Sequence, residues 1–155
     1  MATDATPSGT DSLGPVVGLF VAPGSRLPMQ TRYEVVVEDG RGIVGDRYHA
    51  ARHRQVTVQS VEELDAAAVE HGAPIDPGGT RRNVTLGSGR LDRTPGARMR
   101  IGGVLLEVVR DAAPCKLLED ALGRDARLAL HRRAGVVCRT LEGGRIVLGD
   151  RASRV

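Results

Sequence analysis

Aromatic residues are nearly absent from this chain of 155 residues, which has no Trp, two Tyr and one Phe. Proteins that bind single-stranded nucleic acids stack the bases on aromatic side chains, so we do not expect a nucleic-acid partner of that kind. The apolar fraction of 41% is ordinary. The core must therefore be built from Val, Leu, Ile and Ala, and the length suits one domain.

Cysteine is also scarce, because Cys115 and Cys138 are the only two. Two cysteines without a Cys-x-x-Cys spacing do not make a disulfide framework. No stretch approaches the roughly 20 apolar residues that cross a bilayer, and the first residues lack the apolar centre of a signal peptide. These features predict a cytoplasmic protein with reduced thiols and no membrane partner.

Lysine is almost missing as well, since Lys116 is the only one and the other basic side chains are Arg. The net charge of +3 is small, and no dense run of Arg indicates a nucleic-acid patch. The planar guanidinium of Arg binds oxyanions through two parallel hydrogen bonds. The dispersed Arg residues therefore form either a solvated surface or part of a pocket for a phosphorylated or otherwise anionic ligand.

Glycine, by contrast, is abundant, with 20 residues. Short β-branched runs between Gly-rich turns predict many short strands, and Gly102-Gly103 and Glu142-Gly143-Gly144 each predict a hairpin. The predicted strands are 16–21, 33–37, 54–59, 82–86, 98–101, 104–109, 136–141 and 145–148. Strands of this length joined by tight turns are typical of a barrel or sandwich.

Three helices are predicted between these strands, at 61–71, about 115–122 and about 125–134. Ser60 and Glu63 have the spacing of a capping box, and Gly72 is suited to end the first helix. Arg132 and Arg133 are expected in the last turn of the third helix, where positive charge is favourable. Together the elements predict a mainly β fold with a few helices, a mostly antiparallel β-barrel.

The domain organisation follows from composition. Residues 1–14 are rich in Ser, Thr, Asp, Gly and Pro and are predicted to be disordered. Residues 15–155 contain no further linker and no repeat, so they are predicted to form one domain.

Cys115 is the first candidate for chemistry. It follows Pro114 at the predicted start of a helix, where the helix dipole and free N–H groups favour a thiolate. A thiolate can act as a nucleophile, a sulfur carrier or a ligand for a soft metal, although a buried structural Cys is the alternative. Cys138 lies inside a predicted strand with no such activation, and we interpret it as structural.

Four polar residues are candidates for ligand binding. Arg81 and Asn83 share one face of a predicted strand and offer donors to an anionic or heteroaromatic ligand, although a solvent-facing polar surface is the alternative. Arg54 begins a strand and is expected to direct its head group into one end of a barrel. Arg47 forms either a weak surface pair with Asp46, contributing about 0–1 kcal/mol, or a contact to the ligand.

The order of these segments resembles the MOSC family, which is related to the C-terminal domain of molybdenum cofactor sulfurases. The matching segments are Gly42-Ile43-Val44-Gly45-Asp46-Arg47-Tyr48, Arg54-Gln55-Val56-Thr57, Arg81-Arg82-Asn83-Val84, Pro114-Cys115 and residues 143–150. They resemble the family's Gly-Asp-Arg motif, the strand after it, its Arg-Glu-Asn-Ile segment, its hallmark Pro-Cys and its closing hairpin. Arg82 departs from the pattern, since an acidic residue is usual there.

The resemblance implies a MOSC-type β-barrel that binds the molybdenum cofactor, a phosphorylated pterin holding the metal through a dithiolene. Cys115 would ligate molybdenum or handle sulfur, and Arg47, Arg54, Arg81 and Asn83 would hold the cofactor. The function implied is a small oxidoreductase, acting on N-hydroxylated compounds with an electron-donor protein as partner.

The alternative function is a non-catalytic carrier of the cofactor, or of a Cys115 persulfide. Such a carrier would serve a partner sulfurase whose separate domain uses pyridoxal phosphate. An inert barrel, in which Cys115 has no chemical role, is the third interpretation.

Overall fold

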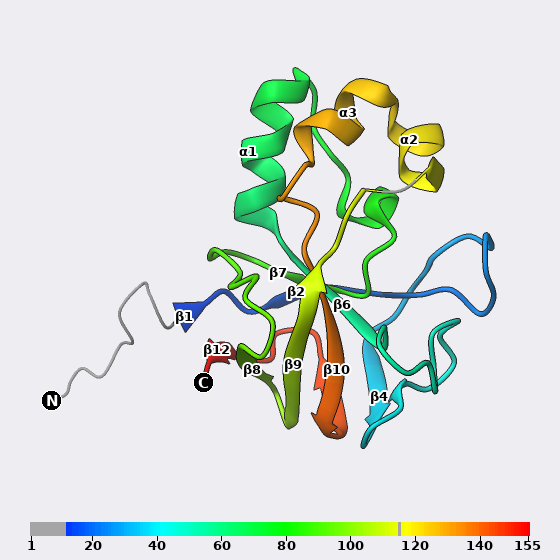
Figure 1. Cartoon of the computed structure of the whole chain (residues 1–155), viewed down its shortest axis with the longest axis vertical. Coiled ribbons are helices and arrows are strands. Elements are labelled where there is room, and N and C mark those ends of the chain that lie inside the picture. The colour runs from blue at the N-terminus through cyan, green and yellow to red at the C-terminus, as the bar shows by residue number, and fades with distance from the viewer. Residues whose placement is uncertain (1–11, 115) are drawn as a thin grey trace, which may run out of the picture.

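The computed structural model describes residues 12–114 and 116–155, which form a mainly β body with three α-helices at one end (Figure 1). This confirms the predicted class. None of the helices in the described part of the chain is long and apolar enough to cross a membrane.

The strands are short, as the glycine-rich turns predict. They are β1 (Ser12–Leu13), β2 (Val16–Val21), β3 (Gln30–Thr31), β4 (Glu34–Glu38), β5 (Gly42–Ile43), β6 (Val56–Ser60), β7 (Val84–Leu86), β8 (Arg98–Ile101), β9 (Val104–Asp111), β10 (Val136–Glu142), β11 (Gly144–Val147) and β12 (Ala152–Arg154). The helices are α1 (Val61–His71), α2 (Lys116–Leu122) and α3 (Arg124–Ala129), with a 3₁₀ turn, η1 (Pro77–Thr80), before β7.

Nine strands pair in the order β1-β12-β8-β9-β10-β6-β7-β2-β3, and a separate sheet has the order β11-β4-β5. Every neighbouring pair is antiparallel except β6 and β7, which run parallel. The mostly antiparallel arrangement is therefore confirmed. No closed barrel is found among the described strands, so a MOSC-type barrel stays a prediction.

The first predicted hairpin is confirmed, because β8 pairs with β9 across Gly102-Gly103. The second is wrong: β11 pairs with β4, whereas β10 pairs with β6 and β9. At this turn the backbone of Gly143 passes close to β4, and a Cβ there would overlap the carbonyl oxygen of Val37. The glycines thus let the chain leave one sheet for the other instead of folding back.

The main core is aliphatic, as the shortage of aromatic residues requires, and it is formed by side chains from both sheets. Leu13 belongs to this core, so the folded part starts before residue 15. The predicted disorder of residues 1–11 concerns residues outside the described chain.

The central strand β6 is buried on both faces. Two of its polar side chains form hydrogen bonds with polar side chains just before and within the parallel strand β7. Thr57 Oγ1 donates to Asn83 Oδ1 at 3.0 Å, and Gln59 Nε2 donates to Thr85 Oγ1 at 2.9 Å. The alternation in the sequence therefore separates an apolar face from a buried, hydrogen-bonded polar face.

Helix α1 has the predicted bounds and ends at Gly72, which adopts a left-handed φ of 83°. The predicted capping box is not formed. Ser60 Oγ instead donates to the carbonyl oxygen of Gly89 at 2.6 Å, and Glu63 pairs with Arg93 at 2.7 Å. Partners from a distant loop therefore replace the local bonds.

Helix α3 is shorter than predicted, and Arg132 and Arg133 follow it instead of forming its last turn. The chain turns because Arg132 has a φ of 58°, which leads it toward β10. The three helices enclose a second, smaller core that includes Leu64, Leu118 and Leu130.

Candidate functional site

Three of the predicted site residues, Arg47, Arg54 and Arg81, line one cavity of about 310 Å³. They come from separate parts of the chain: the loop after β5, the segment before β6 and the residue after η1. The other lining residues are Ser25, Arg26, Tyr48, Arg82, Lys116, Leu117 and Asp120. The structure thus brings together side chains that the sequence separates by more than thirty positions.

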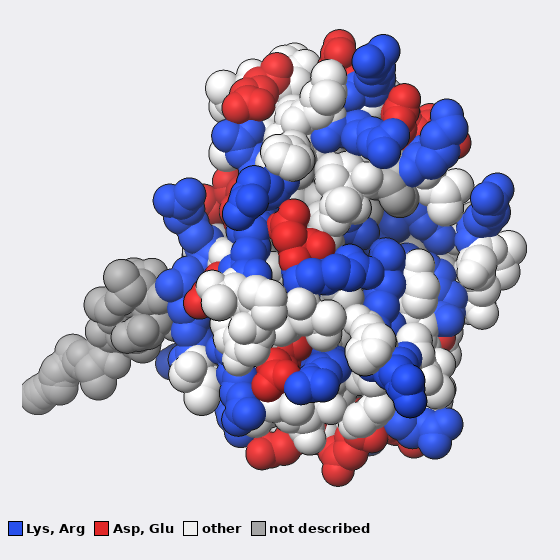
Figure 2. All heavy atoms as spheres, viewed as in Figure 1, with Lys and Arg blue, Asp and Glu red and all other residues white. Residues whose placement is uncertain are grey.

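The cavity is strongly cationic. Among the described residues that line it, six are Arg or Lys and Asp120 is the only acidic one. The Asp120 carboxylate pairs with Lys116 at 3.4 Å. Figure 2 shows a group of basic side chains at the level where the helices meet the strands. A concave site with one sign of charge concentrates the field and attracts ligands of the opposite sign.

Arg47 is fixed in this wall by a buried ion pair. Its Nη1 lies 3.1 Å from Asp46 Oδ1, and the two side chains are only 5% and 0% exposed. Its Nη2 donates to the carbonyl oxygen of Arg81 at 3.1 Å. The interpretation of a weak surface pair is therefore wrong, because the loop after β5 folds inward.

Asp46 is a residue that the sequence analysis did not identify as important. Its carboxylate also accepts hydrogen bonds from Ala22 N at 3.0 Å and from Tyr48 N at 3.2 Å. Asp46 therefore anchors the loop that carries Arg47. The sequence signal of this tight turn is Gly45, just before Asp46, because its φ of 88° lies in the left-handed region that favours glycine.

Asn83 lies behind the cavity wall and is not one of its lining residues. Its side chain is almost completely buried, and its Nδ2 donates to Phe20 O at 3.0 Å and to Asp46 Oδ1 at 3.2 Å. Its Oδ1 accepts from the backbone and side chain of Thr57. Asn83 thus positions Asp46, and through it Arg47, while a direct contact to a cofactor stays a prediction.

Tyr48 supports two of the arginines. The guanidinium carbons of Arg47 and Arg54 lie 4.5 Å and 4.4 Å from the centre of its ring. Cation–π contacts of this length contribute about 0.5–1 kcal/mol at partly exposed sites. The ring therefore contacts both guanidinium groups and helps to hold them in the wall.

Arg81 follows η1 in a left-handed conformation, with a φ of 64°. For a residue with a Cβ this conformation costs roughly 1–2 kcal/mol. Residues held in such regions cluster at functional sites, because the surrounding structure must enforce them. The hydrogen bond from Arg47 to the Arg81 carbonyl is one contact that stabilises this conformation.

Arg82 is the departure from the family pattern, and it is 1% exposed. Its Nε donates to Ala134 O at 2.7 Å and its Nη2 donates to Ala113 O at 3.0 Å. Ala113 precedes α2 and Ala134 follows α3, so Arg82 ties both ends of this helical segment to the start of β7.

Cys115 lies outside the described residues, so its role stays a prediction. Lys116 and Leu117, the next two residues along the chain, line the cationic cavity. Cys138 is fully buried in β10, and burial raises the pKa of its thiol well above the usual range. Cys138 is therefore a core residue, in agreement with its structural interpretation.

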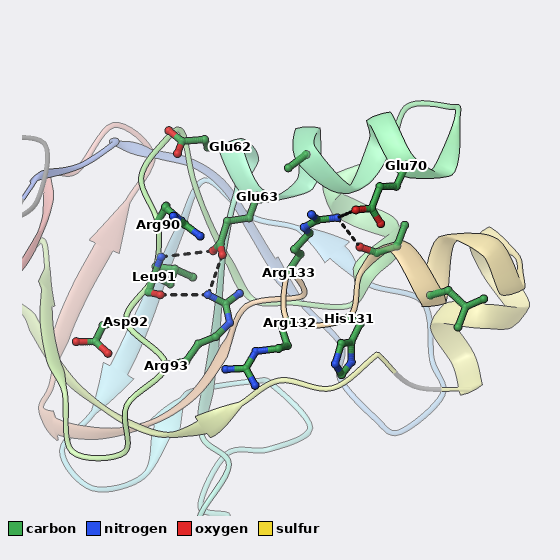
Figure 3. Close-up of a pocket in the computed structure, with 13 residues that line it drawn as sticks. Glu62, Glu63, Glu70, Arg90, Leu91, Asp92, Arg93, His131, Arg132 and Arg133 are labelled. Atoms are coloured by element: carbon green, nitrogen blue, oxygen red, sulfur yellow. Dashed lines mark hydrogen bonds and ion pairs between the residues drawn. The ribbon is translucent and has the colours of Figure 1, made fainter.

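A larger cleft of about 830 Å³ lies between α1, residues 90–93 and the chain after α3 (Figure 3). Arg47, Arg54, Arg81 and Asn83, the predicted site residues that the structure describes, do not line it. Its charges are matched: Arg93 lies 2.7 Å from both Glu63 and Asp111, and Arg133 lies 2.8 Å from Glu70. We therefore place the candidate site in the smaller cavity, where positive charge is in excess.

Metal-binding side chains do not cluster in the described part of the chain, where no group of three or more His, Cys, Asp or Glu could hold an ion. The chemistry of the cavity, as described, is that of anion binding by guanidinium and ammonium groups.

Solved structures share this fold. The YuaD protein from Bacillus subtilis superposes with a TM-score of 0.81 at 20% identity, over 93% of this chain and 96% of that one. YiiM from Geobacillus stearothermophilus gives 0.60 at 20% identity, over 92% and 73%. YiiM from Escherichia coli gives 0.66 at 16% identity, over 92% and 69%.

No curated protein matches the chain in sequence. Residues 45–153, which include the arginines of the cavity wall at positions 47, 54, 81 and 82, match the MOSC domain. This match covers well over half of the sequence. The chain therefore belongs to the MOSC domain family.

Proposed function

We propose that this protein binds the molybdenum cofactor in the cationic cavity. The observation that carries the proposal is that the described residues lining the cavity include six basic side chains and one carboxylate. The cofactor carries a phosphate, and guanidinium groups bind phosphate oxygens through two parallel hydrogen bonds. The donor set of the cavity therefore fits the anionic part of the group that the family implies.

Arg54 and Arg81 are the residues that we assign to the phosphate. Arg47 contributes a third guanidinium whose position is set in advance by Asp46 and Tyr48. A donor that is already fixed loses little conformational entropy when the ligand binds. Asn83 acts through Asp46 in this proposal.

Cys115 is the residue that we propose as the protein ligand to molybdenum, because a thiolate suits a soft metal. When bound, the cofactor supplies redox chemistry at its metal. The chain itself binds and orients the cofactor, and it takes electrons from a separate donor protein. Reduction of an N-hydroxylated compound is the reaction we propose on this basis.

Elemental analysis tests this assignment. The wild type, Cys115→Ser and Cys138→Ala are each expressed in a host that makes the cofactor, and molybdenum per chain is measured. We expect near-stoichiometric metal in the wild type and in Cys138→Ala, and loss in Cys115→Ser. Equal metal in all three would refute Cys115 as the ligand.

Turnover separates the enzyme from the carrier. The metal-loaded wild type is supplied with a chemical reductant and an N-hydroxylated substrate. Reduction of the substrate supports the oxidoreductase. Metal binding without turnover, or a persulfide on Cys115 found by mass spectrometry, would instead favour the carrier.

A further inference from the structure

A second cavity, of about 410 Å³, adjoins the cationic one. It is lined by Met29, Gly78, Gly79, Arg81, Leu117 and Asp120. Arg81, Leu117 and Asp120 line both cavities. These three residues therefore mark the junction between two compartments.

The second compartment differs in chemistry from the first. The residues that it adds to the shared wall, Met29, Gly78 and Gly79, carry no charge. Asp120 faces Lys116 at 3.4 Å, so its charge is matched. Met29 is held at the junction, because Arg47 Nη1 lies 3.6 Å from its sulfur. Beyond Arg81 and Asp120 the wall thus changes from cationic to uncharged.

The two glycines leave the floor of this compartment bare. Neither has a positive φ, so the backbone does not require glycine at either position. A Cβ on Gly78 would make ordinary contacts of 3.5 Å with the Phe20 ring and 3.6 Å with the Asp76 carboxylate. A Cβ on Gly79 would lie 3.1 Å from the flexible end of Leu122, which is a tight contact. A floor without side chains, beside Leu117, leaves room for a flat apolar group.

We propose that the two compartments form one composite site for a ligand with an anionic group and a flat apolar group. The anionic group binds the arginines, and the flat group lies on Gly78 and Gly79 between Met29 and Leu117. This rests on the proposed function in one respect, namely that the arginines bind an anion.

Calorimetry with two probes tests the composite site on the cofactor-free protein. Inorganic phosphate reports on the cationic compartment alone, and 2-naphthyl phosphate reports on both. We expect the wild type to bind 2-naphthyl phosphate at least about tenfold more tightly, because the second compartment buries the ring. Gly78→Leu should remove this preference and leave the affinity for phosphate unchanged.

Two further variants complete the test, one as a control and one as a second test of the same wall. Gly103→Leu is the matched control, since a side chain there meets open space in the turn between β8 and β9, and it should behave as wild type. Met29→Gln makes the same wall polar without adding bulk to η1, and it should reduce the preference if Gly78→Leu does not fold.

The outcomes separate the two proposals. Equal affinity of the wild type for both probes overturns the composite site and leaves the anion site standing. Failure of both probes to bind overturns the anion site on which it rests. A preference that survives in folded Gly78→Leu and in Met29→Gln also overturns the composite site.

Discussion

The buried pair of Asp46 and Arg47 gives the sharpest prediction for stability. Replacing Asp46 by Asn keeps the shape and the acceptor for Ala22 N, but it removes the charge that faces Arg47. Removing one partner of a buried pair costs about 3–5 kcal/mol, since the remaining charge stays in a poorly solvated position. We expect Asp46→Asn to lower the free energy of unfolding by about 3 kcal/mol. This value is at the lower end of that range because Asn retains part of the hydrogen bonding.

The assay is urea unfolding at neutral pH, with the midpoint compared at constant slope. Glu142→Gln is the matched control, because Glu142 and Arg100 form a pair at 3.2 Å whose side chains are 60% and 43% exposed. Exposed pairs contribute about 0–1 kcal/mol, so this control should hardly change stability. A loss below about 1 kcal/mol in Asp46→Asn would refute the reasoning, because it is the value of a surface pair.

Four further predictions concern Arg82, Gly143 and Cys138. Arg82→Met removes the donors to two backbone carbonyls. Relative to the wild type, hydrogen exchange measured by mass spectrometry should therefore speed up more in α2 and α3 than in the strands. An equal increase in helices and strands would contradict the tethering role. Gly143→Ala should destabilise the fold by about 2 kcal/mol or more in urea unfolding, because its Cβ overlaps β4, whereas Gly103→Ala should change it by less than about 0.5 kcal/mol. Cys138 should resist iodoacetamide in the folded protein, because burial raises the pKa of its thiol and keeps it protonated. Stability should also fall as the pH rises above the ordinary thiol pKa of about 8.5, where only the unfolded thiol ionises, and Cys138→Ala should lose this dependence; rapid labelling of Cys138 at neutral pH would contradict its burial.

Local patterns in the sequence predict the elements well. The bounds of α1 and the role of Gly72 follow from helical spacing and the conformational freedom of glycine. The hairpin at Gly102-Gly103 follows from the same kind of signal. In these cases the residues that decide the structure are neighbours in the chain.

Partner choice between distant segments could not be predicted in this way. Ser60 bonds to Gly89, 29 residues away, and this contact displaces the capping box. At Glu142-Gly143-Gly144 the turn is real, but the next strand pairs with β4 rather than with β10. A local pattern shows that the chain turns and does not show which strand it meets.

The candidate site, too, was only partly predictable from local sequence patterns. The order of motifs identified Arg47, Arg54 and Arg81, which converge on one cavity. The roles of Asp46 and Arg82 depend on burial and on partners far along the chain, such as Ala134 for Arg82. A charged residue that the sequence alone would place on the surface is, in both cases, a fixed internal anchor.

The most direct test of the central claim is the cofactor content of a variant that lacks two cavity arginines. Molybdenum and pterin are measured per chain in the wild type, in Arg54→Gln/Arg81→Gln and in the charge-matched control Arg100→Gln/Arg145→Gln, whose arginines lie in exposed pairs. The account predicts near-stoichiometric cofactor in the wild type and the control, and at least about a tenfold lower content in the cavity variant, which from near-saturation requires a fall in affinity of more than tenfold. Equal cofactor content in all three folded proteins would contradict it.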